Sequence, residues 1–362
     1  METNTKVKKK ILRIVLTLTA ILLLKALFAL SNRFSDFYFH RWYSWSSAAF
    51  RQITGIVPFS VGDVIYAAWI VTAVFFLLNV CYKLIRLAWA EVGLLALKGI
   101  HSLLQLYLAF LILWGFNYER NTLLSDTGIV TGAINTQQLY HLSDTLVQLV
   151  NAEKAKLGDT TGVTQTDLSD TAVFHKAITA YEAAALKWPA LRYKRPSIKP
   201  ALFGEWLNYI GTTGYLNPFT NEAQVNTTTP AVLHPFITCH EIAHQLGYAP
   251  EEEANFVGYL AATSIPDSRF RYAANFDMFL YSVRQLAYKD TTLARTVWSK
   301  AVPGVKADYK AIIKFYEQYS GKIEDYSAQM YDKYLKANKQ EKGIRSYGEV
   351  TGWLVAYFGI KE

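Results

Sequence analysis

Charged residues are scarce in this chain of 362 amino acids. Asp, Glu, Lys and Arg make up 18% of the sequence, while hydrophobic residues make up 51%. A soluble protein of this size needs more charge on its surface, so part of the chain is expected to lie in lipid. Cysteine is also nearly absent, since Cys81 lies in an apolar run and Cys239 lies beside a histidine. Two cysteines in such different settings exclude a disulfide framework and a cysteine-based zinc site.

The surplus of positive charge is confined to the first third of the chain. Residues 1–120 hold 13 Lys and Arg against 5 Asp and Glu, whereas residues 121–362 hold 24 of each sign. A nucleic-acid-binding protein would carry its surplus as a basic face on a folded domain. The net charge of +8 therefore indicates membrane topology and argues against a nucleic-acid partner.

Three apolar runs approach the length of about 20 residues that crosses a bilayer. They cover residues 11–30, 64–82 and 99–116. A buried core helix is the alternative for any single run, but three successive runs with basic ends favour transmembrane helices. Lys25 lies inside the first run, where its long side chain can reach the headgroups.

The basic residues beside these runs predict the orientation of the spans. Five of them lie before or at the start of the first span: Lys6, Lys8, Lys9, Lys10 and Arg13. Three more lie between the second and third spans: Lys83, Arg86 and Lys98. Both segments are therefore expected in the cytoplasm, with Trp42, Tyr43 and Trp45 of the first connection at the outer interface. Residues 26–31 contain no Ala-x-Ala cleavage site, so the first run is interpreted as an uncleaved anchor.

Residues 121–362 have the composition of a globular domain that is long enough to bury its own core. Helical periodicity covers residues 137–157, 170–187, 231–246, 250–263, 270–288, 306–338 with a break near Gly321, and 347–358. Strand character is found mainly at residues 214–229. The predicted fold class is therefore mainly α, with three N-terminal transmembrane helices followed by an α+β domain that contains a small sheet.

The strongest chemical signal in the chain is His240-Glu241-Ile-Ala-His244. Composition alone would give about 0.006 matches to His-Glu-x-x-His in a chain with 7 histidines. On a helix the two histidines lie about 40° apart, so they could share a tetrahedral metal ion. Glu241 projects to the side, where its carboxylate can accept a proton without becoming a ligand. Two buried core histidines are the alternative, but they would leave Glu241 unexplained.

A carboxylate should complete the ligand set, and Pro250 is followed by Glu251, Glu252 and Glu253. Acidic residues are also favoured at any helix N-terminus, because they offset the helix dipole. If a turn at Gly247 brings the next helix back past the histidines, a first-turn carboxylate can complete a zinc site. Glu251 and Glu253 both remain open as the third ligand, whereas Glu252 points about 100° from either neighbour and toward solvent.

This pattern resembles the gluzincin branch of the zinc metallopeptidases, in which a second helix carries Glu-x-x-Ala/Ser-Asp. In this chain the second helix reads Glu251-x-x-Ala254-Asn255. The wider frame is similar to an uncharacterised family of bacterial membrane-anchored proteins placed in that clan. The segments that carry this similarity are residues 214–219, 221–226, 240–249, 253–256 and 346–348.

The resemblance implies a zincin-like domain with Zn²⁺ as its cofactor. His240, His244 and Glu251 would be the metal ligands, and Glu241 would be the general base. Asn255 would lie behind a ligating histidine, in the place of the usual Asp, and would raise the basicity of that ligand less than Asp does. The resemblance implies a hydrolase but no particular substrate.

Several further positions are weaker candidates for the site. Residues 222–227 resemble the strand beside the zinc helix, and an exposed edge there could bind an extended peptide, although an ordinary hairpin strand fits equally well. His234 is interpreted as a structural residue because it lies nearly two turns before His240. Tyr272 and Tyr347 are candidates for stabilising an oxyanion, chosen from 24 tyrosines.

These features predict a membrane domain at residues 1–120 and an extracytoplasmic metallopeptidase domain at residues 121–362, anchored in a bacterial inner membrane with its N-terminus in the cytoplasm. Zinc-activated water, deprotonated by Glu241, would hydrolyse a peptide or protein substrate of the cell envelope. The bilayer is the other expected partner, and the oligomeric state stays open. A catalytically silent zinc scaffold that binds an envelope partner is the alternative, although a scaffold would not need Glu241. A small transporter is less favoured because the spans lack buried acidic residues.

Overall fold

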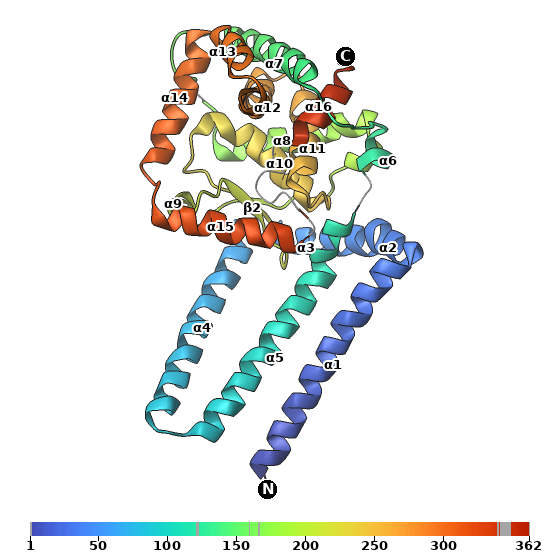
Figure 1. The fold of residues 1–362 in the computed structure, drawn as a ribbon, viewed down its shortest axis with the longest axis vertical. Helices are drawn as coiled ribbons and strands as arrows, with labels where there is room; N and C mark the ends of the chain where they lie inside the picture. Colours follow the sequence, from blue (N-terminus) through green and yellow to red (C-terminus); the bar gives the residue numbers. More distant parts are fainter. Residues whose placement is uncertain are drawn as a thin grey trace.

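The computed structural model describes most of the chain. The described residues are 2–120, 123–158, 160–165, 167–338, 340 and 349–361. The described residues after Arg120 form a mainly helical domain, which we call the outer domain because it lies at one end of three long helices. The N-terminus lies at the opposite end of those helices (Figure 1). The predicted fold class, mainly α with three N-terminal apolar helices and a small sheet, is confirmed.

The three long helices are α1 (Glu2–Leu30), α4 (Val61–Ile85) and α5 (Trp89–Leu113). Each is long and apolar enough to cross a bilayer, with mean hydropathy of 2.3, 2.2 and 1.6 over its most apolar stretch. The third span begins at Trp89 instead of residue 99, and the chain leaves it as a 3-10 helix, η2 (Gly115–Glu119). The number of spans is as predicted, but the third extends further toward the α4–α5 connection.

The connection between the first two spans is helical and belongs to the base of the outer domain. It consists of α2 (Asn32–Phe37), the π-helix η1 (Tyr38–Tyr43) and α3 (Ser44–Thr54). The prediction that Tyr43 lies at the lipid interface is wrong, because only 2% of this residue is exposed. Tyr43 packs in an aromatic cluster with Tyr38 and Trp114 at the junction of the spans and the domain. Trp45, in contrast, is 66% exposed.

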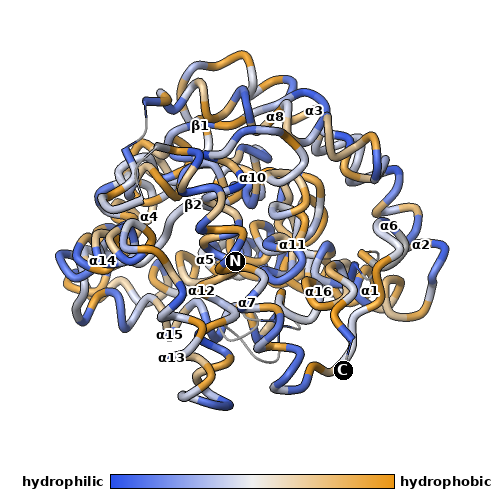
Figure 2. Tube along the Cα trace, turned by 90° about the horizontal axis from the view of Figure 1, so that it is seen from above, coloured by the Kyte–Doolittle hydropathy of each residue, from blue (hydrophilic) through white to orange (hydrophobic). Residues whose placement is uncertain are grey.

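The outer domain is a stack of helices around one apolar core. The helices of the first half are α6 (Leu123–Thr127), α7 (Thr136–Lys156), α8 (Asp170–Lys187), η3 (Pro189–Leu191) and α9 (Gly204–Tyr209). Those of the second half are η4 (Ala231–Leu233), α10 (His234–Gln245), α11 (Glu251–Thr263), α12 (Ser268–Lys289), α13 (Thr291–Ser299), α14 (Pro303–Glu317), α15 (Lys322–Ala337) and α16 (Val350–Tyr357). Viewed along the long axis, apolar and hydrophilic residues are mixed along these helices, as in an ordinary globular domain (Figure 2).

A three-stranded sheet lies beside α10 and has the order β1-β3-β2. The strands are β1 (Ile198–Pro200), β2 (Gly214–Leu216) and β3 (Ala223–Val225). β3 pairs in parallel with β1 and antiparallel with β2. β3 is therefore the central strand, and the prediction of a possible free edge at residues 222–227 is wrong. β1 and β2 are the two edge strands, and β2 is the edge strand that passes over Glu241.

The β2–β3 hairpin is tied to the first turn of the span α4. The carboxylate of Glu222 accepts hydrogen bonds from the backbone amides of Val61 (3.1 Å) and Gly62 (2.5 Å). These amides have no partner within the helix, and a negative charge there also offsets the helix dipole. Asp63 in the same turn accepts hydrogen bonds from the Tyr215 hydroxyl and from the Leu202 amide, the latter at 2.7 Å. The sheet and the second span therefore form one hydrogen-bonded unit.

Candidate metal centre

A tight turn brings α11 back along α10. Gly247 has φ 93°, a left-handed conformation that glycine adopts at no steric cost, and its amide donates to the His244 carbonyl at 2.8 Å. A Cβ at this position would also lie 2.9 Å from the Tyr43 ring and from Arg120 Nη1. The predicted helix end at Gly247 is therefore confirmed. α11 then begins at Glu251, so its first turn faces the last two turns of α10.

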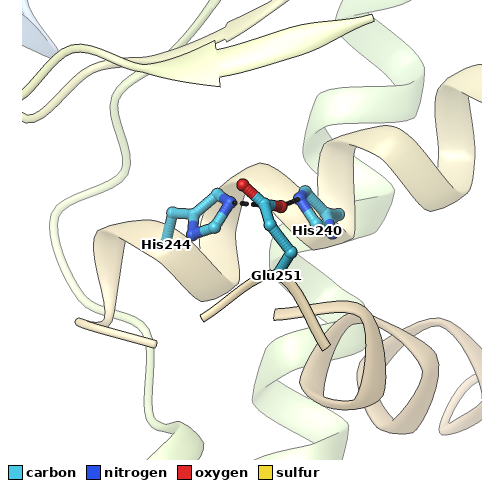
Figure 3. Close-up of side chains that lie close together, drawn as sticks. All are labelled: His240, His244 and Glu251. Carbon is cyan, nitrogen blue, oxygen red and sulfur yellow. Dashed lines mark ion pairs between the residues drawn. The ribbon is translucent and has the colours of Figure 1, made fainter. Parts of the chain in front are cut away.

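His240, His244 and Glu251 come together in one cluster (Figure 3). Glu251 Oε2 lies 3.2 Å from His240 Nε2 and 3.5 Å from His244 Nε2. One ligand atom from each residue lies within 4.8 Å of the other two. The cluster contains the two-histidine, one-carboxylate donor set that zinc commonly takes in hydrolases.

The backbone fixes the orientation of His244. Its Nδ1 lies 2.7 Å from the carbonyl oxygen of Tyr248, just beyond the turn. A hydrogen bond from Nδ1 leaves Nε2 as the lone-pair nitrogen, and Nε2 is the atom that faces Glu251. The ring of Trp114, which follows the span α5, meets the His244 ring edge to face at 6.0 Å. The cluster thus sits directly on the membrane end of the outer domain.

His240 is supported by different neighbours. No hydrogen bond to its Nδ1 is found among the described residues, and none joins it to Asn255. Burial raises the pKa of Asp277 on α12 to about 6. The charge of His240 acts in the opposite direction and lowers the pKa of Asp277. Tyr281, one turn further along α12, lies near Asp277, Glu251 and Asn255. α12 packs against both α10 and α11, and the sequence pattern of α11 alone did not indicate this neighbour of His240.

Glu241 lies beside the cluster and not within it. It is 3% exposed, and one carboxylate oxygen, Oε2, has no hydrogen-bond partner in the described parts of the chain. A Cβ added to Gly214 would lie 2.7 Å from Glu241 Oε1, so the first residue of β2 passes directly over this carboxylate. Burial raises the pKa of Glu241 to about 7, even though the charges of His240 and His244 lower it. Such a carboxyl group is suited to take up and release a proton near neutral pH.

The three consecutive glutamates of α11 have separate surroundings. Only Glu251 reaches the histidines. Glu252 is half-buried and lies 3.4 Å from the Gln340 amide nitrogen. Glu253 is buried near Arg120 and Asp126, and burial together with Glu252 raises its pKa to about 8. The structure therefore brings Glu251, and not Glu253, into the cluster.

Helix α15 covers the cluster with a tyrosine that sequence reasoning did not identify. The hydroxyl of Tyr331 donates a hydrogen bond to Glu251 Oε1 at 2.5 Å. One turn further along, the Tyr334 hydroxyl lies 3.3 Å from the hydroxyl of Tyr118 in η2. The sequence separation of 80 residues between Tyr331 and Glu251 gave no local signal for this contact.

The connection between the first two spans supplies a second unforeseen support. The buried Arg51 guanidinium donates to the carbonyl of Gln245 at 3.0 Å and to the side-chain oxygen of Asn221 at 2.7 Å. The Tyr43 hydroxyl lies 3.3 Å from the His244 carbonyl and 3.2 Å from that of Gln245. Helix C-termini leave such carbonyls without intrahelical partners. These two residues therefore fix the C-terminal end of α10, next to His244.

The remaining predicted residues lie elsewhere. His234 contacts the Thr229 carbonyl at 2.9 Å, as expected for a structural residue. The prediction of Tyr272 as an oxyanion partner is wrong, because its hydroxyl donates to Asp308 at 2.5 Å in a buried ion-pair cluster with Lys154. Tyr347 and the rest of residues 346–348 lie outside the described residues.

The donor atoms of the cluster fit a divalent metal ion. Within the described chain, the buried Glu251 Oε2 faces the Nε2 atoms of both histidines but makes no hydrogen bond of regular geometry. Burial lowers the pKa of His244, but the Glu251 carboxylate outweighs this and raises the pKa to about 9. Burial raises the pKa of Glu251, but the two histidines outweigh this and hold that pKa far below its usual range. A buried carboxylate with nearby imidazoles is a strong binding set for a cation such as Zn²⁺.

Three apolar helices and a helical domain with a histidine and carboxylate cluster define a membrane protein with a candidate metal centre. The chain belongs to the family described as protein of unknown function (DUF3810), whose model matches residues 38–355. The match covers the first connection, two spans and the outer domain. No curated protein and no solved structure matches the chain.

Proposed function

We propose that the protein is a membrane-anchored zinc metallopeptidase of the zincin type. The observation that carries this proposal is the cluster of His240, His244 and Glu251 within 4.8 Å, with Glu241 beside it under the strand β2. A site that only held a metal for structural reasons would need the three ligands but not a buried carboxylate next to them.

Each residue has a specific role in this proposal. His240, His244 and Glu251 would hold the ion. When bound, zinc would supply Lewis acidity, which polarises a carbonyl group and lowers the pKa of water. Glu241 would accept the proton of the attacking water and then pass it to the leaving amine. Because β2 has a free edge beside Glu241, it would hydrogen-bond an extended peptide and hold its carbonyl group near the cluster.

The charge distribution supports an outer location for this site. In Figure 1 the N-terminus and the α4–α5 connection lie at the end of the spans away from the domain. A groove at that end is lined by six basic residues: Lys6, Lys9, Lys10, Arg13, Lys83 and Lys98. Basic residues beside spans stay in the cytoplasm, so the domain would face the outside of a bacterial inner membrane. A reporter enzyme that is active only outside the cytoplasm, fused after residue 362, should be active.

The decisive experiment separates metal binding from catalysis. The full-length protein in lipid nanodiscs is loaded with zinc and incubated with a complex peptide mixture, and new peptide termini are identified by mass spectrometry. Glu241→Gln should keep one zinc per chain but lose about 10²–10⁴-fold in cleavage rate, because it lacks the basic carboxylate. His240→Ala should lose both zinc and cleavage.

Glu205→Gln, on α9, is the matched control and should behave like the wild type. If the wild type binds zinc but produces no new termini, the peptidase proposal fails and the zinc scaffold for an envelope partner replaces it. If the wild type and all of the variants fail to bind zinc, the peptidase proposal and the scaffold alternative are both excluded.

A further inference from the structure

Helix α15 lies across the ends of α4 and α5 that face the outer domain (Figure 1). Two contacts fix it there. The ring of Tyr334 packs edge to face on Phe110 of the span α5, with centroids 6.4 Å apart. Its hydroxyl lies 3.3 Å from that of Tyr118, just after the same span. Phe110 is close to the end of α5 at Leu113, so α15 lies at the depth where this span leaves the hydrocarbon.

The two sides of α15 differ in polarity. On a helix of about 100° per residue, Ile323, Met330 and Tyr334 fall within about 40° of one another, and Tyr326 lies beside them. Asp325, Asp332 and Lys336 fall on the opposite side. Apolar and aromatic side chains therefore lie on one face of α15, and these charged side chains lie on the opposite face.

The described parts of the chain leave most of the apolar face exposed. Ile323 is 62% exposed, Tyr326 is 66% exposed and Met330 is 49% exposed. We call these three residues the apolar strip of α15. The strip shares its face with Tyr334, which contacts the span α5, so the strip is turned toward the membrane side of the domain.

Neighbouring parts of the domain also lie at membrane depth. Phe219, at the tip of the β2–β3 hairpin, packs edge to face on Trp69 of the span α4, with centroids 4.9 Å apart. The 73% exposed Trp206 lies on α9, and Tyr209 of the same helix contacts Tyr319 shortly before α15. Aromatic side chains of this kind are enriched where a protein meets the lipid headgroups.

We propose that α15 is an interfacial helix whose apolar strip lies in the outer leaflet of the bilayer. Lipid is the occupant that the structure favours, because the strip is continuous with the apolar surface of the candidate span α5 through Tyr334 and Phe110. The helix holds three basic and three acidic residues, so apolar contact and not net charge attaches it. The same helix carries Tyr331 onto Glu251, so the cover of the candidate metal centre is itself bound to the membrane.

Fluorescence quenching at single positions tests this assignment without any assumption about activity. The native cysteines are first removed by Cys81→Ala and Cys239→Ala. Four proteins are then made with a single new cysteine, at position 323, 330, 325 or 288, and that cysteine is labelled with an environment-sensitive fluorophore. Asp325 is the matched control on the opposite face of α15, and the 85% exposed Tyr288 precedes α13 at the far end of the domain. The labelled full-length proteins are reconstituted in vesicles of phosphatidylcholine and phosphatidylglycerol.

Nitroxide lipids should quench the labels on the strip, at positions 323 and 330, at least threefold more strongly than the control labels at positions 325 and 288. Iodide in the water should quench the control labels more strongly than the strip labels. If iodide quenches 323 and 330 as strongly as 325, the strip faces water and the proposal is overturned. Protection of 323 and 330 from both quenchers would show that protein, such as a second copy of the chain, covers the strip, and would also overturn it. Zinc binding by the same samples reports separately on the proposed function.

Discussion

The Tyr331 hydroxyl donates a 2.5 Å hydrogen bond to the Glu251 oxygen that does not face the histidines. A carboxylate that binds a metal through one oxygen is held in place by a donor on the other, and loss of such a partner typically weakens metal binding about 10–100-fold. Tyr331→Phe should therefore weaken zinc binding by about this factor, as measured by competition with a chromophoric chelator. Tyr326→Phe on the exposed face is the control and should bind as tightly as the wild type. Equal affinities for all three proteins would contradict the role given to Tyr331.

The separate surroundings of the α11 glutamates predict distinct effects on zinc content. Glu251→Ala should abolish stoichiometric zinc, as should His240→Ala and His244→Ala, because two protein donors remain in each case. Glu252→Ala and Glu253→Ala should retain one zinc per chain in elemental analysis of purified protein. A zinc-free Glu253→Ala beside a zinc-loaded Glu251→Ala would show that the third ligand has been assigned wrongly.

Arg51 should be needed for stability although it lies in the connection between two spans. Arg51→Met keeps the apolar stem but leaves the carbonyls of Gln245, Lys194 and Arg195 without this donor. Unsatisfied buried groups of this kind cost about 3 kcal/mol in total, which lowers Tm by about 6–12 °C in a domain of this size. Thermal unfolding of the two proteins in the same nanodiscs measures the shift. Arg41→Met, in the same connection but exposed, should leave Tm within about 1 °C of the wild type.

The buried ion pair of Lys154 and Asp308 should support the fold but not the metal centre. Both side chains are fully buried, and their charged atoms are 2.9 Å apart. Asp308→Asn leaves the ammonium group buried without its counter-charge and should cost about 3–5 kcal/mol. Tyr272→Phe removes one hydrogen bond to the same carboxylate and should cost about 1 kcal/mol. Zinc affinity of the folded fraction should be unchanged in both variants, and a lost metal site in Tyr272→Phe would restore that residue as a candidate for the active site.

Acid should remove the stabilisation that Asp267 provides. Burial raises the pKa of this carboxyl, but hydrogen bonds from Lys176 and the Arg269 amide outweigh burial and hold it below its usual 3.8. The unfolded chain therefore binds the proton more tightly, so the contribution to stability is complete above about pH 4 and is lost as pH falls through the folded pKa. Asp267→Asn should unfold at a lower Tm than the wild type at pH 6, and the gap should narrow at pH 3. A gap that stays constant would show that the charge of Asp267 is not involved.

Local patterns were sufficient for the three long apolar helices, for most of the longer helices of the domain and for most of the candidate site, but they did not predict shorter helices such as α3, α9 and α13. His240, Glu241 and His244 lie within one helix, and Gly247 and Pro250 mark the turn that returns the chain, so their relation follows from helix geometry. The choice between Glu251 and Glu253 needed the actual packing of α11 on α10. Glu251 and Glu253 project about 160° apart on α11, and a sequence pattern does not show which side of this helix packs against α10.

Contacts between distant segments were not predictable from the sequence. Tyr331 reaches Glu251 across 80 residues, and Arg51 reaches Gln245 across 194. Aromatic residues near spans are common at the lipid interface, so the sequence predicts Tyr43 there, but its hydroxyl contacts backbone carbonyls at the end of α10. Tyr272 was one of 24 tyrosines, and nothing in its neighbourhood along the chain indicated the Asp308 cluster.

The bond between Glu222 and the first turn of α4 links the candidate site to the thickness of the membrane. A span that is too long or too short for the surrounding hydrocarbon, about 30 Å in an average bilayer, responds by tilting. The β2–β3 hairpin is attached to the first turn of α4, and its first residue passes over Glu241 on α10. A tilt of this one helix should therefore displace the outer edge of β2 relative to His240, His244 and Glu251. The geometry of the candidate site should therefore depend on the length of the surrounding acyl chains. We expect it to differ between short-chain detergents and long-chain lipids.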